Sequence, residues 1–392
     1  MRIAYVTHTR FPTEKAHGYQ VAQVCDALVS LGNQVTLVAP TVRRNAAKGD
    51  PFRFYGMQPS FSFEYLTNFD ALTSPFIPGK IAFSVSMWSY RRRLRQFLAS
   101  HSFDLLYARS PVVLQPLIDS GRPVILELHA LPRRDRRHFK ALCNRCQRVV
   151  ALTYPMRDAL VALGVESALV VVEGDAVDPE RFRKTLSSPG AKRHWNLPQE
   201  IPVVGYVGSL ATYDRIQKGV DVLIHALASL KKSGFPVFGW IVGGPKHWED
   251  HYRRLAYSHG LTEGDIRFQG QVRAREIPDA LAACDVCAYP APHSKHAFFQ
   301  RDTSPLKLFE YLAASRPVVC ADIPPVRDIV DDRSVRFFHP GDHRSMAGAI
   351  RQVLEHPREA TARKRAGLSV VEGHTWKERM RRIFKGIRIT NT

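Results

Sequence analysis

The chain has 392 residues, which suits two domains of ordinary size and is too long for one small core. Its hydrophobic content of 45% and aromatic content of 10% exclude a disordered protein. The net charge of +20 favours an anionic partner, in the form of a phosphorylated substrate, an anionic membrane or a nucleic acid.

The first forty residues predict a βαβ unit. A short apolar strand at 2–6 leads into a loop containing Pro12 and Gly18, and an amphipathic helix follows. Gly32 ends this helix, and VTLVAP at 35–40 is the next strand. A connection of this length, with one helix between two strands, is typical of parallel strands that lie next to each other in a sheet. Further strands of the first half are predicted at 105–108, 123–128, 148–152 and 168–172.

The segment 187–202, SSPGAKRHWNLPQEIP, is polar and rich in proline and glycine, and we interpret it as a linker. After it the alternation of strands and helices resumes. These strands are predicted at 203–207, 238–244, 266–268, 286–290 and 317–321. We therefore expect an α/β fold with two doubly wound Rossmann-like domains that face a central cleft. Ligands of such sheets bind at the carboxyl ends of the strands.

The amino-terminal stretch MRIAYVTHTRFPTEK is not typical of a secretory signal, because its apolar run is short. No stretch reaches the roughly eighteen apolar residues of a membrane-spanning helix. We therefore expect a cytoplasmic protein.

Two C-x-x-C pairs, Cys143/Cys146 and Cys284/Cys287, raise the question of a zinc site. Such a site would require both pairs to meet in space. The second pair lies where a predicted helix end runs into a buried strand. We therefore interpret these cysteines as small buried apolar side chains and expect no bound metal.

A first candidate anion site lies in GYVGSLATYDRIQKGVDVL. A strand ends at Val207, a glycine turn follows, and Arg215 and Lys218 precede a helix that starts near Gly219. Exposed N–H groups and a lysine at a helix start bind anions. The alternative is that Lys218 is a solvated loop lysine. The absence of a G-x-G-x-x-G after the first strand and of a Walker P-loop argues against dinucleotide oxidoreduction and P-loop chemistry.

A second candidate anion site is the stretch DTSPLKLFEYLAASRPVV. Ser304 can cap a helix, and Pro305 suits its first turn. The free N–H groups of Leu306 and Lys307 would then be ready for a phosphate.

Glu310 lies one turn further along this helix and can accept hydrogen bonds from a ribose diol, and Asp302 lies on the loop that leads in. The alternative for Lys307 and Glu310 is an ion pair between positions i and i+3.

His129, in VILELHALP, follows the end of a buried strand and is placed for a ligand cleft. A capping role for this histidine is an equal alternative. Gly18, after the first strand, permits close approach of the backbone to a ligand.

The chain resembles the glycosyltransferases of family 4, which are retaining enzymes with the GT-B fold. In the first half the resemblance rests on EKAHGYQVAQVCDALVSLGNQVTLV and ELHALP. In the second half it rests on GYVGSL…QKGVDVLIHAL, IVGGP, FQGQV…IPDALAACDVCAYP and SPLKLFEYLAASRPVVCAD. HTWKERMRRIF resembles the last helix of the family, which returns to the first domain. The resemblance implies an acceptor-side domain at 1–190, a nucleotide-sugar domain at 191–372 and a returning helix at 373–392.

The resemblance implies sugar transfer from a nucleotide-diphosphate sugar to a glycan or lipid-linked acceptor, without a metal or other cofactor. Lys218 matches the lysine that binds the diphosphate, and Gly18 matches the glycine near the donor phosphates. His129 matches the histidine beside the transferred sugar, and Glu310 the glutamate on the ribose. We assign His129, Lys218 and Asp302 to catalysis. The expected donor-binding residues are Gly18, Ser209, Arg215, Lys218, Ser304, Leu306, Lys307 and Glu310.

Three positions depart from the family pattern. Ser209 stands where the family often has an arginine, for which Arg215 is a candidate substitute. Asp302 replaces the first glutamate of the E-x7-E pair, and Ala176 replaces a glycine. These departures keep open a catalytically weakened GT-B protein that binds a nucleotide-sugar or a partner enzyme. A nucleotide-sugar epimerase and a basic nucleic-acid-binding protein are further alternatives, although no nucleic-acid-binding motif supports the latter and we expect no nucleic-acid partner.

The segment 87–103, MWSYRRRLRQFLASHSF, suits a helix that lies on an anionic membrane at the inner face of the plasma membrane. The alternative is an ordinary helix packed on its domain. LPRRDRRHFK adds four arginines near His129, which favours an anionic glycan or a lipid diphosphate as acceptor. The expected membrane contacts are Trp88, Tyr90, Arg91, Arg92, Arg93 and Arg95.

Overall fold

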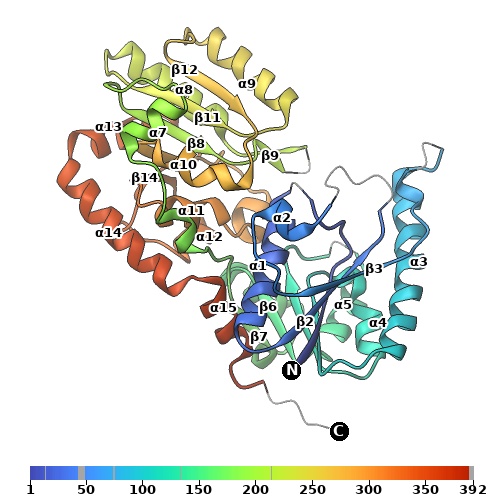
Figure 1. The fold of residues 1–392 in the computed structure, drawn as a ribbon. Coiled ribbons are helices and arrows are strands. Elements are labelled where there is room, and N and C mark those ends of the chain that lie inside the picture. Colours follow the sequence, from blue (N-terminus) through green and yellow to red (C-terminus); the bar gives the residue numbers. More distant parts are fainter. Residues whose placement is uncertain (14, 43–48, 74–75, 133, 213, 388–392) are drawn as a thin grey trace. The chain divides into compact units, whose positions relative to one another are not determined.

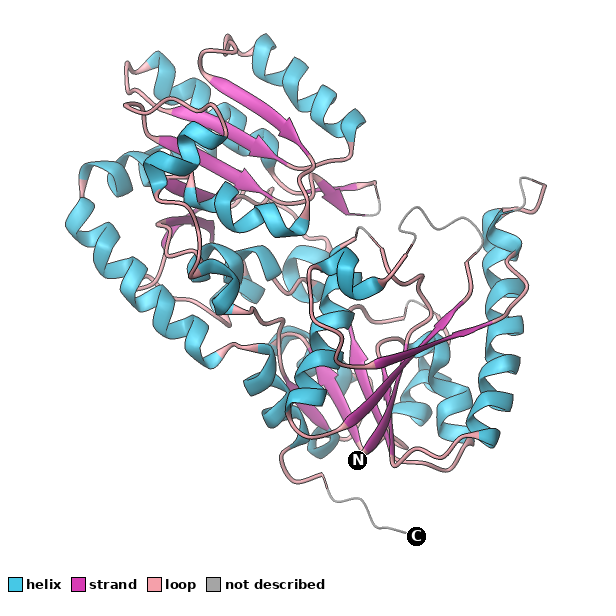
Figure 2. Ribbon diagram, in the orientation of Figure 1, coloured by secondary structure: helices cyan, strands magenta, loops and turns pink. Residues whose placement is uncertain are grey.

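The computed structural model describes residues 1–13, 15–42, 49–73, 76–132, 134–212 and 214–387. Contacts divide the chain into two units (Figures 1 and 2). Unit 1 comprises Met1–Asp175 and Trp376–Thr392, and unit 2 comprises Ala176–Thr375. The first change of unit therefore lies between Asp175 and Ala176, earlier than the boundary at residue 190 that the sequence suggested.

Unit 1 is built on a seven-stranded parallel sheet with the order β3-β2-β1-β4-β5-β6-β7. The strands are β1 Arg2–Val6, β2 Gln34–Pro40, β3 Ser62–Leu66, β4 Leu105–Ala108, β5 Val124–Leu128, β6 Arg148–Ala151 and β7 Val170–Val172. The α-helices are α1 Ala16–Ser30, α2 Pro51–Tyr55, α3 Gly79–Ser100, α4 Leu114–Asp119, α5 Arg136–Cys143, α6 Tyr154–Ala162 and α15 Trp376–Phe384. The strands expected from the sequence are confirmed, and β3 is an addition.

Unit 2 has a six-stranded parallel sheet with the order β12-β11-β8-β13-β14-β15 and a small antiparallel hairpin. The sheet strands are β8 Val203–Val207, β11 Phe238–Val242, β12 Ile266–Gly270, β13 Val286–Tyr289, β14 Val318–Ala321 and β15 Arg336–Phe338, and the hairpin is β9 Ala211–Thr212 with β10 Ile216–Gln217. The α-helices are α7 Ser188–His194, α8 Val220–Lys232, α9 Lys246–Ser258, α10 Ile277–Ala282, α11 Leu306–Ala313, α12 Pro324–Arg327, α13 His343–Glu355 and α14 Pro357–Gly373. In the described residues, no helix combines the length and apolarity that crossing a bilayer requires.

The segment 187–202 is not a linker. Ser187 caps α7, because its hydroxyl accepts a hydrogen bond from the N–H of Gly190 over 3.3 Å. Trp195 follows this helix and is buried, with its ring centre 5.5 Å from that of Trp240. The prolines and glycine of this segment suggested an open connection, but its apolar side chains pack into the core of unit 2.

Both connections between the units pass through one small region of unit 2. Val177 forms a parallel bridge with Thr375, and the N–H of Val177 donates to the carbonyl of His374 over 3.0 Å. The chain enters and leaves unit 2 at neighbouring points. Beyond Thr375, α15 packs on α1 within unit 1.

A buried ion pair stands out in the apolar core of unit 1. Strand β5 is buried along its whole length, yet its fourth residue is Glu127. A guanidinium nitrogen of Arg379, from α15, lies 3.0 Å from the Glu127 carboxylate, and both side chains are almost completely buried. Arg379 also donates to the carbonyls of Glu173 and Gly174, just before the chain leaves unit 1. The pair therefore fastens the last helix to the central sheet.

We expect Arg379→Met to lower the free energy of unfolding of unit 1 by about 3–5 kcal/mol, because it leaves the Glu127 carboxylate buried without a cation. Burial raises the pKa of Glu127, but Arg379 and the hydrogen bonds from His129 and Tyr107 outweigh burial and keep it well below its usual value. The contribution is therefore complete above the unfolded pKa of about 4.3 and is lost as the pH falls through the lowered pKa.

Urea denaturation followed by circular dichroism at pH 7 and at successively lower pH measures this loss. Arg381→Met, on the same helix, is the matched control, since Arg381 forms an exposed pair with Glu378. We expect the control to change stability by less than about 1 kcal/mol. Equal losses in the two variants would contradict the assignment.

Candidate functional site

Lys218 and Gly219 mark the start of α8 in unit 2. The ammonium of Lys218 is buried and lies 3.6 Å from the ring centre of Phe298. Burial, and to a smaller extent the nearby Lys307, lowers the pKa of Lys218 to about 6. Gly219 has a φ of +79°, and a Cβ at this position would lie 2.8 Å from the backbone of Ala291. Lys218 is thus not a solvated loop lysine.

Lys307 lies on the first turn of α11 and forms a second cationic centre. Its ammonium donates to the hydroxyl of Tyr206 over 2.7 Å and lies 4.2 Å from the centre of the same ring. The ring of Tyr289 is 5.2 Å away. Burial lowers the pKa of Lys307 to about 7. Two lysines within electrostatic reach of each other therefore rest mainly on aromatic rings, an arrangement that an anion would stabilise.

Glu310, one turn after Lys307, is buried and lies 3.8 Å from the guanidinium of Arg181. Burial raises the pKa of Glu310, and Arg181 and Lys307 oppose that effect. Because Lys307 bonds to Tyr206 and Glu310 faces Arg181, the two charges do not form the intrahelical ion pair that we considered as an alternative. A carboxylate so placed can accept hydrogen bonds from hydroxyl groups of a ligand.

The start of α11 differs from the prediction. The helix begins at Leu306, and its N-cap residue is Pro305, so Ser304 does not cap it. The N–H of Leu306 donates to the carbonyl of Ser304 over 3.0 Å. Leu306 therefore uses its N–H within the chain, and the N–H of this residue is not free for a phosphate as the sequence had suggested.

The remaining predicted residues of unit 2 lie around these two helix starts. Asp302 ends a π-helical turn, Phe298–Asp302, and its carboxylate is bound by the guanidinium of Arg301 at 2.6 and 3.1 Å. The carbonyl of Ser209 accepts a hydrogen bond from the hydroxyl of Tyr206 over 2.6 Å. Arg215 is exposed on the β9–β10 hairpin, so the structure does not bring it into the buried lysine cluster.

In unit 1, His129 follows β5 and belongs to a hydrogen-bonded network. Its Nε2 lies 2.8 Å from the carboxylate of Glu127, and its Nδ1 lies 3.3 Å from the guanidinium of Arg109. Burial and the charge of Arg109 lower the pKa of His129 to about 4, despite Glu127. The neutral ring therefore donates through Nε2 and accepts through Nδ1. This excludes the simple capping role, and at neutral pH the ring lacks the second proton of an imidazolium, which a general acid would need.

Gln20 extends this network to Asp175, the last residue of the first segment of unit 1. Its amide donates to Glu127 and Asp175 over 3.0 and 2.7 Å, and its carbonyl accepts two bonds from Arg109. Gly18, two residues earlier on α1, has a packing reason for lacking a side chain. A Cβ there would lie 2.2 Å from the hydroxyl of Tyr55.

Helix α3 bears the predicted basic surface. The prediction of Tyr90 as a membrane contact is wrong, because its side chain is fully buried and its hydroxyl donates to the carbonyl of Thr7 over 2.8 Å. Arg91 donates to the carbonyl of Val112. Trp88, Arg92, Arg93 and Arg95 are exposed, and Arg95 lies 3.4 Å from Asp119. Of the four arginines expected near His129, Arg133 lies outside the described residues.

Several residues around the predicted site residues were not identified from the sequence. Glu127 had a signal, because a carboxylate inside the apolar run VILEL requires a buried partner. Arg379, Arg181 and Phe298 had none, since their roles depend on contacts between segments distant in sequence. All six cysteines are buried, and no group of three or more potential metal ligands occurs in the part of the chain that the structure describes.

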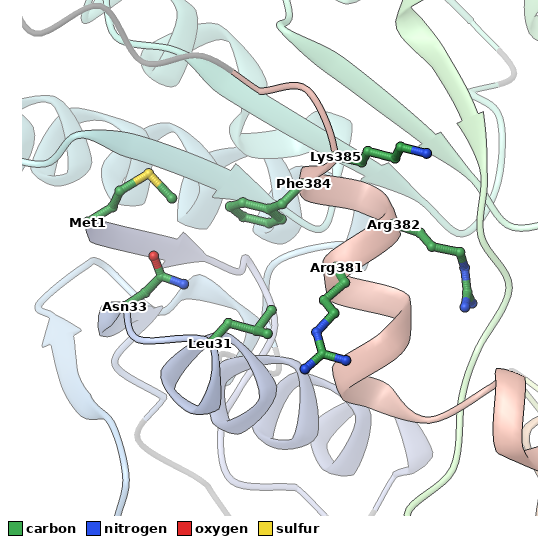
Figure 3. A pocket seen from close by; sticks show the side chains of 7 residues that line it. All are labelled: Met1, Leu31, Asn33, Arg381, Arg382, Phe384 and Lys385. Atoms are coloured by element: carbon green, nitrogen blue, oxygen red, sulfur yellow. The ribbon is translucent and has the colours of Figure 1, made fainter.

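One cavity of unit 1, of about 400 Å³, is lined by residues at the end of α1 and along α15 (Figure 3). It lies beside Met1, at the amino end of β1, whereas His129 follows the carboxyl end of β5. Its arginines are engaged, since Arg382 pairs with Glu173 and Arg381 with Glu378. The cavity is therefore distinct from the network around His129.

Comparisons with known proteins agree with this architecture. Residues 18–181 match the model of glycosyltransferase family 4, and residues 201–356 match the model of glycosyl transferases group 1. The O-antigen chain mannosyltransferase B of Escherichia coli is 26% identical over 174 residues, which are 44% of this chain and 42% of that protein. The match thus spans less than half of this curated relative.

Two crystal structures share the fold over nearly the whole chain. Anabaena HepE, in complex with UDP and glucose, has a TM-score of 0.73 and 18% identity, covering 99% of this chain and 100% of that one. WaaG, a glycosyltransferase involved in lipopolysaccharide biosynthesis, has a TM-score of 0.70 and 15% identity, with full coverage of both chains. One family model falls on each half of the chain, and the protein therefore belongs to the family 4 and group 1 glycosyltransferases and has the GT-B fold.

Proposed function

We propose that the protein transfers a sugar, with retention and without a bound metal, from a nucleotide-diphosphate sugar to a glycan or lipid-linked acceptor. One observation carries the donor assignment. Lys218 and Lys307 lie at two helix starts of unit 2, next to strand ends, and rest on aromatic rings instead of carboxylates. A diphosphate would supply the counter-charge to both.

The chemistry of a glycosyl transfer suits this site. As the bond to the anomeric carbon breaks, negative charge grows on the departing diphosphate, and positive charge grows on the sugar ring. The amines of Lys218 and Lys307, whose pKa values are lowered to about 6 and about 7, take up protons when the dianion binds, and the resulting charges stabilise the leaving group. In this proposal Glu310 accepts hydrogen bonds from the ribose hydroxyls, and Asp302 contacts hydroxyls of the donor sugar.

His129 has a supporting role in this proposal. Because both ring nitrogens are engaged and its pKa is about 4, it acts as a neutral dipole beside the transferred sugar and not as an acid. Glu127 and Arg109 hold the orientation of the ring. Gly18 is assigned to the neighbourhood of the donor phosphates on the family resemblance alone.

The relatives support the choice of substrates. HepE was crystallised with UDP, with UDP and glucose, and with UDP-glucose. The mannosyltransferase builds an O-antigen chain, and WaaG acts in lipopolysaccharide biosynthesis. We therefore propose a nucleotide-sugar donor, a saccharide acceptor carried by a lipid, and peripheral contact with the inner face of the plasma membrane through the exposed side of α3.

A second candidate function is binding of a nucleotide-sugar without transfer. It is favoured by Asp302, whose carboxylate is occupied by Arg301, and by Ser209 in place of the arginine frequent in the family. Turnover of a bound nucleotide-sugar distinguishes the two functions.

We expect Lys218→Ala and Glu310→Ala to abolish the rise in melting temperature that a nucleoside diphosphate or its sugar gives the wild-type protein. A cleft ligand stabilises by mass action, and each variant removes a group that the donor uses. A thermal-shift screen across nucleotides measures this. Lys232→Ala, an exposed lysine at the other end of α8, is the control and should keep the full shift. A full shift in both site variants would place the donor elsewhere.

Gly219→Ala should weaken the same shift, because its Cβ would push Lys218 and the start of α8 away from Ala291. Gly234→Ala is the matched control. Gly234 has a similar φ of +70°, but nothing lies within 4 Å of a Cβ there. Each variant bears the backbone strain, about 1–2 kcal/mol, but only Gly219→Ala should lose nucleotide affinity. Equal nucleotide shifts in both would contradict the assigned site.

Retention and independence from metal are tested together. The protein is incubated with the nucleotide-sugar identified by the screen and with candidate lipid-linked saccharides, in the presence of EDTA. Proton NMR should show a product with the anomeric configuration of the donor, at a rate that EDTA leaves unchanged. An inverted product, or loss of turnover that a divalent cation restores, would refute the corresponding part of the proposal.

A further inference from the structure

The start of α3 and the residues before it carry an unusual set of exposed apolar side chains. Phe76 is 93% exposed, Trp88 64% and Phe69 61%. We call the whole group the apolar tip, and its members are Phe69, Leu72, Phe76, Ile81, Phe83 and Trp88. Soluble proteins rarely expose apolar groups together in this number without a partner.

Hydrogen bonds bring the two parts of the apolar tip together. The N–H of Phe69 donates to the hydroxyl of Ser89, and the N–H of Ala71 donates to the hydroxyl of Ser86, both over 2.9 Å. The short helix Ala71–Thr73 therefore lies against the same turns of α3 that carry Trp88. Figure 1 shows α3 at the outer side of unit 1, with its first turns extending past the neighbouring elements of that unit.

The opposite face of α3 already holds the helix in place. Ala82, Met87, Tyr90 and Leu94 are buried in unit 1, and Tyr90 anchors its hydroxyl on the carbonyl of Thr7. The buried face thus holds this helix on unit 1, while every member of the apolar tip, including Phe83 beside the ring of His8, is at least 40% exposed.

The charge around the apolar tip distinguishes an anionic bilayer from a second copy of the chain as its partner. Between residues 67 and 95 the sequence has one acid, Asp70, and five bases, Lys80, Arg91, Arg92, Arg93 and Arg95. Arg91 and Arg95 are engaged with Val112 and Asp119, while Arg92 and Arg93 are exposed and follow Trp88 along the helix. A second copy would present the same positive charge and be repelled, whereas an anionic bilayer would attract it.

We propose that the apolar tip inserts into the boundary between the headgroups and acyl chains of an anionic bilayer, while Arg92 and Arg93 contact the headgroups. This deepens the proposed function, since it names the part of the protein that meets the membrane where a lipid-linked acceptor would lie. It differs from a helix lying flat on the surface, because the apolar and basic parts follow one another along α3 instead of occupying opposite faces.

Trp88 is a natural reporter, because Trp195, Trp240 and Trp376 are buried and Trp248, on α9 of unit 2, is half-buried. Full-length protein is mixed with vesicles of phosphatidylglycerol and phosphatidylcholine whose acyl chains carry bromine. We expect a blue shift and quenching that persist at about 1 M salt, where the Debye length is about 3 Å. Trp88→Phe should remove the quenching.

The double variant Phe76→Ser with Ile81→Ser should bind these vesicles at least about tenfold more weakly. Its control is Phe54→Ser with Val161→Ser, which removes two exposed apolar side chains elsewhere on unit 1 and should bind normally. Arg92→Ser with Arg93→Ser should weaken binding at low salt but leave the remaining quenching in place.

Three results would overturn the proposal. They are the absence of vesicle binding, binding without quenching that disappears at high salt, and self-association in the absence of vesicles that the Phe76→Ser, Ile81→Ser variant abolishes. The thermal shift with nucleotides is measured without vesicles, and the apolar-tip variant should retain it. Failure of insertion is therefore distinguishable from failure of the donor assignment.

Discussion

The ion pair between Glu127 and Arg379 influences several parts of unit 1 besides the two residues that form it. A carboxylate within a fully buried strand is tolerated only because a cation from the last helix meets it. The same carboxylate orients His129, and the same guanidinium holds the carbonyls of Glu173 and Gly174. The orientation of a site histidine, the docking of α15 and the path by which the chain leaves unit 1 thus share one electrostatic origin.

Unit 2 uses a different arrangement, in which the described contacts of two lysines are with aromatic rings and a tyrosine hydroxyl, and Glu310 pairs with Arg181. Lys218 and Lys307 are supported by the rings of Phe298 and Tyr206, which stabilise an ammonium without neutralising it. A protein carboxylate in that place would compete with an anionic ligand. Burial of both lysines, and for Lys218 also the nearby charge of Lys307, lowers their pKa values.

The sequence predicted most strands and both sheets, because local periodicity carries that information, but it missed β3, β15 and the β9–β10 hairpin. Lys218, Lys307 and Glu310, which the sequence singled out as donor-binding residues, lie near two helix starts of unit 2. The prediction failed at Ser304, because Pro305 and not the serine is the N-cap residue of α11. It also failed at 187–202, where packing of Trp195 overrode a composition typical of linkers. Arg181 and Arg379 could not be assigned at all, because their partners are set by tertiary contacts. The exposed apolar tip was likewise hidden, since solvent exposure depends on what the fold leaves uncovered.

The bridge between Val177 and Thr375 means that unit 2 has its two ends side by side. In topological terms it is an inserted domain, and unit 1 is a discontinuous one that is completed only by the last helix. During synthesis, the central sheet of unit 1 therefore emerges long before the cation that neutralises its buried carboxylate. Until Arg379 arrives, Glu127 must remain hydrated or protonated, so the first domain to be synthesised is the last to be completed.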